Sequence, residues 1–249
     1  MSAEVFQSRS ETLTIGAARD LIARGGFTPA HIPGCELWLE GRRITGLNDN
    51  DPVTNWLDYS GNGKVATQAT AGLKPLFQAT TNNGKAAVRC DGLDDKLTLQ
   101  DSGVVTANYS IFLVCKQTAD ADIAMISNIG QSAAGAGGSN FTMQQASGVA
   151  YVYWESSDNL YLFGTLVTPA DGWLLIHLRN VGSTSQLIVN GTQLATNTGT
   201  NRSVRLGNGN IGYDFSNDYY FTSVIQALLE YDHALTAAEE ALVTKYLGF

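Results

Sequence analysis

Short runs of alternating apolar and polar residues, separated by Gly, Asn, Asp and Ser, fill most of this chain. The clearest case is Asn190-Gly191, which separates the runs 186–189 and 192–195. An Asn-Gly pair in this setting predicts a tight hairpin, because a type I′ turn needs positive φ at both central residues. The repetition of such runs and turns, with 26 glycines in all, predicts an all-β chain of short antiparallel strands.

The length and composition fit one large domain. The 249 residues are 44% hydrophobic and only 15% charged, which is enough apolar material for a single core. No internal repeat of solenoid or propeller period is visible. The pattern therefore predicts a two-sheet antiparallel β-sandwich, or jelly roll, in which the continuous apolar run 109–116 is a central strand.

Both ends of the chain depart from the β pattern. A helical pattern over 15–24 and two prolines, Pro29 and Pro33, set residues 1–33 apart as an N-terminal arm or anchor. The alternative, a terminal segment that packs on its own domain, stays open. Thr236 and Glu239 form a capping-box pattern before a short C-terminal helix. We expect residues 34–249 to form the sandwich domain together with this helix.

The charge balance argues against several partners. The formal net charge is −8 and no tract is rich in Lys or Arg, so we expect no nucleic-acid binding. No stretch approaches the roughly 18 apolar residues of a membrane span. The first twenty residues lack the apolar core of a signal peptide, so we expect synthesis in the cytosol without one. The cysteines, Cys35, Cys90 and Cys115, have the flanks of buried apolar groups.

Four motifs carry a resemblance to a known family. They are Leu37-Trp38-Leu39, the series Trp56-x-Asp58-x-Ser60-Gly61, an Asn-Gly-x-x-Ala-Val pattern over 83–88, and the closing segment 230–239. Their order is similar to the laminin-G-like jelly-roll domains of the bacterial and phage type, within the concanavalin A-like lectin/glucanase superfamily. The resemblance covers about residues 34–249 and implies a jelly-roll sandwich. It implies less about the ligand, because this fold hosts lectins, glycanases, adhesion modules and virion parts.

The carboxylates do not form a catalytic pattern. Glycanases of this fold need two acids that face one glycosidic bond, and alternate residues of one strand supply them. The segment 224–232 offers only Glu230 and Asp232 near its end, and Ala227 stands where such domains often carry a glutamate. No Gly-x-Ser-x-Gly, Walker loop or His-Glu-x-x-His is present. We expect that the chain is not an enzyme.

Two turns could hold Ca²⁺, which takes carboxylate and carbonyl oxygens. One contains Asp91, Asp94 and Asp95, and the other contains Asp214, Asn217 and Asp218. Neither turn has the spacing of an EF-hand. Calcium is therefore a candidate cofactor, and ordinary turn aspartates are the alternative.

Two groups of aromatic residues have the character of a sugar site, which combines ring faces with polar groups. Tyr151 and Tyr153 share one face of a predicted strand, in a hairpin whose other strand carries Tyr161 and Phe163. The preferred site is the polar loop around residues 213–220. Its candidate contact residues are Tyr213, Phe215, Asn217, Tyr219 and Tyr220. Packing within the sheet or core is the alternative for both groups.

The leading hypothesis is a non-catalytic surface, adhesion or decoration protein of a phage virion that binds a glycan or cell-surface polysaccharide. Residues 1–33 would contact other virion proteins, and we expect a homo-oligomer at the virion surface. A bacterial carbohydrate-binding module or lectin is the first alternative. A polysaccharide hydrolase or lyase is the second.

Overall fold

The computed structural model describes residues 26–249 with internal gaps, and before them only Gly16, Asp20 and Arg24. The gaps are 82–83, 100–103, 118–122, 130–139, 147–148, 156–159, 166–171, 199–203, 208, 215–218 and 221. Of the strands between residues 123 and 165, and at residues 105, 117, 205, 214, 219 and 223, only the backbone is described.

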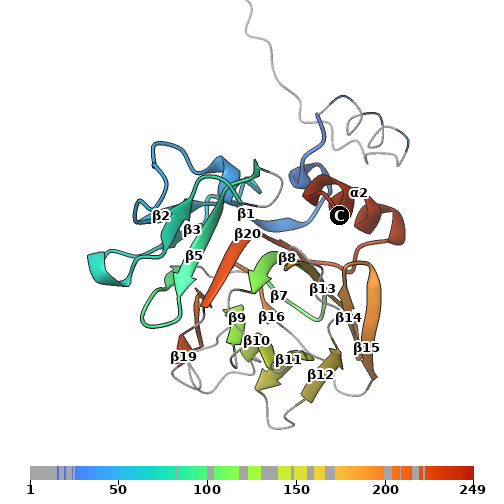
Figure 1. The fold of residues 1–249 in the computed structure, drawn as a ribbon. Coiled ribbons are helices and arrows are strands. Elements are labelled where there is room, and N and C mark those ends of the chain that lie inside the picture. The colour runs from blue at the N-terminus through green and yellow to red at the C-terminus, as the bar shows by residue number, and fades with distance from the viewer. Residues whose placement is uncertain are drawn as a thin grey trace, which may run out of the picture.

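The described strands form two large antiparallel sheets, as the sequence predicts (Figure 1). Sheet A has the order β15-β14-β13-β8-β20-β5-β4, and β1 also pairs with β20. Its strands are β1 (Cys35–Glu40), β4 (Leu76–Gln78), β5 (Ala87–Asp91), β8 (Asn108–Gln117), β13 (Trp173–Val181), β14 (Thr184–Val189), β15 (Thr192–Thr198) and β20 (Thr222–Tyr231). The predicted central strand is confirmed, since β8 lies between β13 and β20.

Sheet B has the order β12-β11-β10-β9-β17-β6-β3-β2. Its strands are β2 (Asn55–Leu57), β3 (Val65–Thr67), β6 (Leu97–Leu99), β9 (Ile123–Ile129), β10 (Asn140–Ala146), β11 (Val149–Glu155), β12 (Leu160–Thr165) and β17 (Gly209–Ile211). Two short ribbons accompany the sheets. They are β7 (Val105–Thr106) with β16 (Val204–Arg205), and β18 (Tyr213–Asp214) with β19 (Tyr219–Tyr220).

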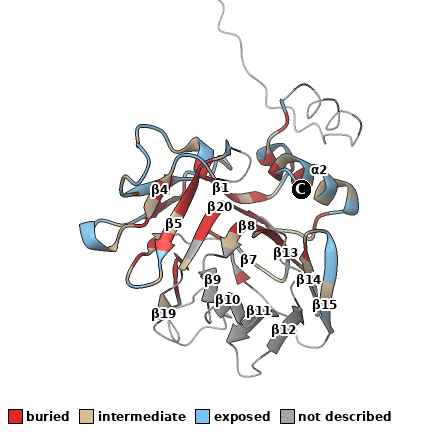
Figure 2. Ribbon diagram, in the orientation of Figure 1, coloured by how far each residue is buried: buried red, intermediate tan, exposed pale blue. Residues whose placement is uncertain are grey.

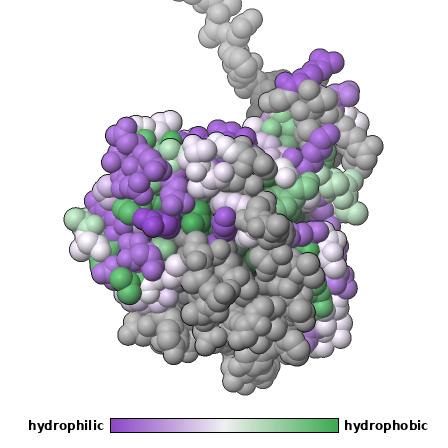
Figure 3. All heavy atoms as spheres, in the orientation of Figure 1, coloured by the Kyte–Doolittle hydropathy of each residue, from purple (hydrophilic) through white to green (hydrophobic). Residues whose placement is uncertain are grey.

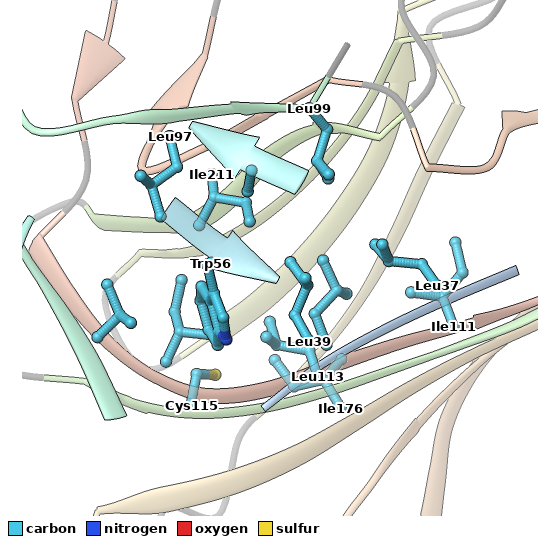
Figure 4. Close-up of a cluster of buried hydrophobic side chains, with 14 of the residues drawn as sticks. Leu37, Leu39, Trp56, Leu97, Leu99, Ile111, Leu113, Cys115, Ile176 and Ile211 are labelled. Carbon is cyan, nitrogen blue, oxygen red and sulfur yellow. The ribbon is translucent and has the colours of Figure 1, made fainter. Parts of the chain in front are cut away.

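The main hydrophobic core lies between the two sheets (Figure 4). Trp56 and Leu97 of sheet B face Leu113 and Ile176 of sheet A, and all four are at most 2% exposed. Burial of such large side chains contributes roughly 1.5–3 kcal/mol each, so this layer holds the sandwich together. The resemblance to a jelly-roll sandwich is thereby confirmed at the level of the fold.

A second core covers part of the outer face of sheet A, which is the face turned away from sheet B. The helix α2 (Ala237–Leu247) packs there beside the segment 27–32, with Phe27, Ile32 and Leu242 buried against the sheet (Figures 1 and 2). The hydroxyl of Tyr231 donates to the carbonyl of Pro29 at 3.3 Å. The last residues of the predicted arm therefore pack on the sandwich. The predicted helix over 15–24 lies almost entirely outside the described residues, and the boundary at residue 33 stays a prediction.

Several local predictions are confirmed. The Thr236 side chain accepts from the Glu239 N–H at 3.4 Å, the Thr236 N–H donates to the Glu239 carboxylate at 2.8 Å, and Gly248 ends α2 at a φ of 90°. The hairpin between β14 and β15 turns at Asn190 and Gly191, with φ of 48° and 78°. Short 3₁₀ helices are η1 (Pro29–His31), η2 (Gly41–Arg43) and η3 (Ala71–Leu73).

The three cysteines are buried, as the sequence predicts, and they form no disulfide. Asp58 holds its turn by accepting from the N–H groups of Ser60 at 2.8 Å and Trp38 at 2.9 Å. Among the described helices, none has the length and apolar character that a membrane span needs.

Candidate functional site

The candidate site begins with a row of side chains that crosses four neighbouring strands of sheet A. Strand register pairs Arg89 of β5 with Val224 of β20, Val224 with Lys116 of β8, and Lys116 with Trp173 of β13. Their sequence neighbours on the opposite face belong to the main core, namely Val88, Ile225, Cys115 and Leu174. Because side chains alternate across a strand, the row lies on the outer face.

This row forms the floor of a hollow of about 570 Å³, which we call the outer-face hollow. Its lining includes Gln78, Arg89, Asp91, Lys116, Trp173 and Thr222. Pockets that hold small ligands have volumes of roughly 300–1,000 Å³ and combine apolar surface with a few polar groups. The outer-face hollow has both properties: Val224 and Trp173, which belong to the second core and are each 4% exposed, form an apolar base, and the other side chains named above offer donors and acceptors.

The described lining carries two positive charges and one negative charge, although the whole chain has a net charge of −8. Arg89 and Lys116 are half-buried, and Asp91 is exposed at the edge of the sheet. The Nε of Arg89 is buried and has no hydrogen-bond partner within the described part of the chain. A buried donor without an acceptor lowers the stability of the folded chain, because it has lost its hydrogen bonds to water. An acceptor atom of a ligand could restore the missing hydrogen bond to Arg89 Nε.

Next to the outer-face hollow is the acidic turn, which we define as residues 91–95. Carboxylate oxygens of Asp91, Asp94 and Asp95 all lie within 4.8 Å of one another. Asp91 accepts from the Leu93 N–H at 2.8 Å, and Asp95 accepts from the Asp91 N–H at 3.0 Å. Burial raises the pKa of Asp95 to about 6, with the charges of Asp91 and Asp94 adding to the shift. This oxygen-rich group fits the donor set of Ca²⁺.

The predicted aromatic loop is described only in part. The rings of Tyr213 and Tyr220 lie 4.7 Å apart, and Lys96 Nζ lies 4.4 Å from the centre of the Tyr213 ring. Tyr213 is only 9% exposed, so most of its ring is covered, whereas Tyr220 is half-buried. Strand register pairs Asp214 with Tyr219, and Phe215, Asn217 and Asp218 lie outside the described residues.

The second predicted aromatic group lies on β11, at a distance from this region within sheet B. Strand register pairs Tyr151 with Phe163 and Tyr153 with Tyr161, which confirms the predicted hairpin of β11 and β12. The structure describes only the backbone there. The placement of Tyr151 and Tyr153 in a sugar site stays a prediction.

The acids near the end of β20 do not face a common opening. Glu230 is fully buried, and one of its oxygens accepts from the Gly207 N–H at 2.6 Å. Burial raises its pKa to about 8. Asp232 instead contacts His233 at 3.1 Å in a half-buried position. Glu230 is therefore a structural group of the interior and is not accessible to a saccharide.

Sequence reasoning missed Arg89, Lys116 and Trp173 as site residues. Each follows ordinary strand alternation, and no local motif marks them. One weak signal was available: Arg89 is a charged residue within the apolar run 86–90. Only the pairing of β5, β20, β8 and β13 brings these residues into one row.

No protein-family model and no curated protein matches this sequence. Solved structures match the fold. The botulinum neurotoxin type G receptor-binding domain has a TM-score of 0.59 and 13% identity, over 85% of this chain and 51% of that one. The binding domain of Paraclostridial Mosquitocidal Protein 1 has a TM-score of 0.59 and 10% identity, over 89% of this chain and 54% of that one.

An arabinofuranosidase complexed with arabinofuranosyl-alpha-1,2-xylobiose has a TM-score of 0.60 and 12% identity, over 85% of this chain and 58% of that one. This chain spans about half the length of the toxin domains that it matches. At such low identity the likeness shows the fold alone. The chain has a concanavalin A-like β-sandwich fold.

Proposed function

We propose that this chain is a non-catalytic carbohydrate-binding module and that its ligand occupies the outer-face hollow. The observation that carries the proposal is the row of Arg89, Val224, Lys116 and Trp173, in which two half-buried charged donors stand over an apolar base whose Val224 and Trp173 are each 4% exposed. Sugars present apolar C–H faces and hydroxyl groups, and sites that bind them supply aromatic and polar groups in the same way.

The fold neighbours support a binding role. Two of them are a receptor-binding domain and a binding domain of toxins or toxin-like proteins, and a third is an arabinofuranosidase in complex with an oligosaccharide. The resemblance to laminin-G-like domains adds adhesion modules and lectins to the same group. The proposal therefore favours the carbohydrate-binding module over the virion protein of the leading sequence hypothesis. The virion role, with contacts through residues 1–33, stays a prediction.

The charges of the hollow support binding without bond cleavage. Glycoside hydrolysis generally uses two carboxylates about 5–10 Å apart on either side of the scissile bond. The described lining of the outer-face hollow contains one carboxylate, that of Asp91. Two basic residues, Arg89 and Lys116, stand on its floor.

A glycan array with the full chain tests the proposal. The substitution Gln78→Trp places an indole in the hollow. It should abolish binding to every glycan on the array that the unmodified chain binds. The matched control is Thr192→Trp, at an exposed position of β15 outside the lining of the hollow. Equal binding by the two variants would contradict the proposed location.

A reducing-sugar assay on the bound polysaccharides tests the absence of catalysis. The proposal predicts no release of reducing ends above the rate of a heat-denatured sample. Sustained release that is lost in Gln78→Trp would make the chain a hydrolase.

A further inference from the structure

Two cations on the floor of the outer-face hollow lie on strands separated by one other strand. Neighbouring strands are about 4.8 Å apart, so the backbones at Arg89 and Lys116 are about 10 Å apart across β20. Val224 lies between them in register and carries no polar side-chain atom. The two charged groups can therefore reach a single ligand that lies over Val224.

Neither cation forms an ion pair within the described residues, although the charge of Arg89 acts on Asp95 and lowers its pKa against the larger effect of burial. Four other basic side chains have carboxylate partners: Arg42 and Arg43 pair with Glu40, Lys64 with Glu36, and Arg179 with Glu240. Arg89 and Lys116 make no such pair in the described part of the chain, and Arg89 Nε is buried without an acceptor. Arg89 and Lys116 are half-buried and close together, so one bound anion could form ion pairs with both side chains.

We infer that the outer-face hollow selects an acidic glycan, with a carboxylate or sulfate of the sugar held between Arg89 and Lys116. The inference rests on the proposed function and adds the class of ligand. A guanidinium donates two parallel hydrogen bonds to such a group, and an ammonium acts as a point charge beside it. A neutral sugar would leave the donors of Arg89 with weaker acceptors.

Asp91 sets the orientation of the ligand. Asp91 lines the hollow at the end of β5, two residues from Arg89, and one of its carboxylate oxygens accepts from the Leu93 N–H at 2.8 Å. In the calcium-free chain, Asp91 would repel an anion at that end and accept hydrogen bonds from sugar hydroxyls. The anionic group therefore lies towards Lys116 and Trp173, and the neutral part of the glycan lies towards Asp91 and Thr222.

Isothermal titration of the full chain with trigalacturonate and with its methyl ester tests the inference. The two probes share a sugar skeleton and differ in charge. The acid should bind at least about tenfold more tightly than the ester, because hydrogen bonds to charged groups account for differences of this size. Two further probes are a sulfated trisaccharide and inorganic sulfate. The first shows whether the hollow prefers a sulfate to a carboxylate, and the second shows whether it binds an anion without a sugar.

The variants Lys116→Gln and Arg89→Gln each remove one positive charge from the hollow. Each should weaken the binding of the preferred acidic glycan by about tenfold or more. The matched control is Lys245→Gln, which makes the same charge change at an exposed position of α2 and should bind as the unmodified chain does. If Arg89→Gln fails to fold, as judged by circular dichroism, Lys116→Gln decides the question.

The outcomes separate the two proposals. The acid and the ester could bind equally, with full affinity in both charge variants but not in Gln78→Trp. In that case the inferred selectivity for acidic glycans is wrong and the proposed binding function stands. If Lys245→Gln loses as much as Lys116→Gln, the effect is one of overall charge and the inference fails. If inorganic sulfate binds as tightly as the sugars, the hollow is a simple anion site and both proposals fail.

Discussion

The hydroxyl of Tyr246 donates a hydrogen bond of 2.8 Å to Glu40, and this contact joins α2 to β1 across the outer face of sheet A. Glu40 is 1% exposed, and its carboxylate also accepts from Trp38 Nε1 at 3.2 Å and pairs with Arg42 and Arg43. A buried carboxylate is tolerated when it has such a complete set of partners. This contact helps to fix α2 beside the outer-face hollow.

The first prediction concerns this contact. The substitution Tyr246→Phe should lower the free energy of unfolding by about 1.5–3 kcal/mol, since it removes a hydrogen bond to a charged acceptor. Urea denaturation measures the change. The control is Tyr59→Phe, whose hydroxyl donates to the neutral carbonyl of Arg43 at 2.9 Å and whose loss should cost only about 1 kcal/mol. An unchanged stability in Tyr246→Phe would show that the contact does not hold the helix.

The second prediction concerns Glu230. Burial raises its pKa to about 8, with the opposing effects of the Gly207 N–H and Lys64 and the reinforcing charges of Asp58 and Glu36. The folded chain therefore holds a proton that the unfolded chain releases above its ordinary pKa of 4.5. The contribution to stability is complete below pH 4.5 and is lost as the pH rises to about 8.

The substitution Glu230→Gln tests this dependence, because the amide oxygen can still accept from Gly207. Urea denaturation at pH 5 and pH 8 should show that the variant loses much less stability on going to the higher pH. The difference between the two proteins should be a few kcal/mol. Parallel pH profiles would mean that Glu230 is ionised in the folded chain throughout this range.

The third prediction concerns His177, which is stacked on Phe112 with ring centroids 4.0 Å apart. Burial, with a smaller effect of Arg179, lowers its pKa to about 3. The unfolded chain takes up this proton below pH 6.5 and the folded chain does not until about pH 3, so stability falls across that window. At pH 5 the loss should be about 2 kcal/mol.

The substitution His177→Phe keeps the ring stack and removes the titration. Its stability should fall less than that of the unmodified chain between pH 6.5 and pH 5, as measured by urea denaturation. The same decline in both proteins would contradict a neutral, buried His177.

The fourth prediction concerns calcium. We propose that the acidic turn binds Ca²⁺ through Asp91, Asp94 and Asp95, since their mutual repulsion would be relieved by a cation. A ligand at a hundred times its dissociation constant contributes about 2.7 kcal/mol. Each kcal/mol shifts the melting temperature of a domain of this size by about 2–4 °C, so excess calcium should raise it by several degrees.

Thermal melts with calcium and with a chelator measure this shift. Asp94→Asn should abolish it, and Asp214→Asn in the second predicted cluster should leave it unchanged. A shift that survives Asp94→Asn and is lost in Asp214→Asn would move the site to the loop around residues 213–220.

The sequence predicts those features that depend on a few neighbouring residues. The turn at Asn190 and Gly191 and the capping box of Thr236 and Glu239 are local, because the conformational preferences of adjacent residues determine them. The placement of Trp38 shows where local reasoning stops. Its alternation with apolar residues predicts burial, and Trp38 is buried, but only the strand pairing shows that it packs in the second core on the outer face of sheet A, with Tyr246.

The outer-face hollow is a product of strand pairing between distant segments. Arg89, Lys116, Trp173 and Val224 come from four parts of the sequence, and a shift of one residue in any of these strands would turn its side chain to the other face. The aromatic residues of the predicted loop around Tyr213 are close together in the chain, so the sequence alone predicts their grouping. Adjacent residues in a sequence carry more weight in pattern reading than residues that become neighbours only in a sheet.

The most direct test of the account is nuclear magnetic resonance mapping of the full chain during titration with the glycan that binds best. The backbone amide signals of Arg89, Lys116, Thr222 and Val224 should shift together and reach saturation at one equivalent. The signals of Gln193 and Thr244, near the other side of α2, should stay in place. Shifts that avoid the first group and gather elsewhere would show that the outer-face hollow is not the ligand site.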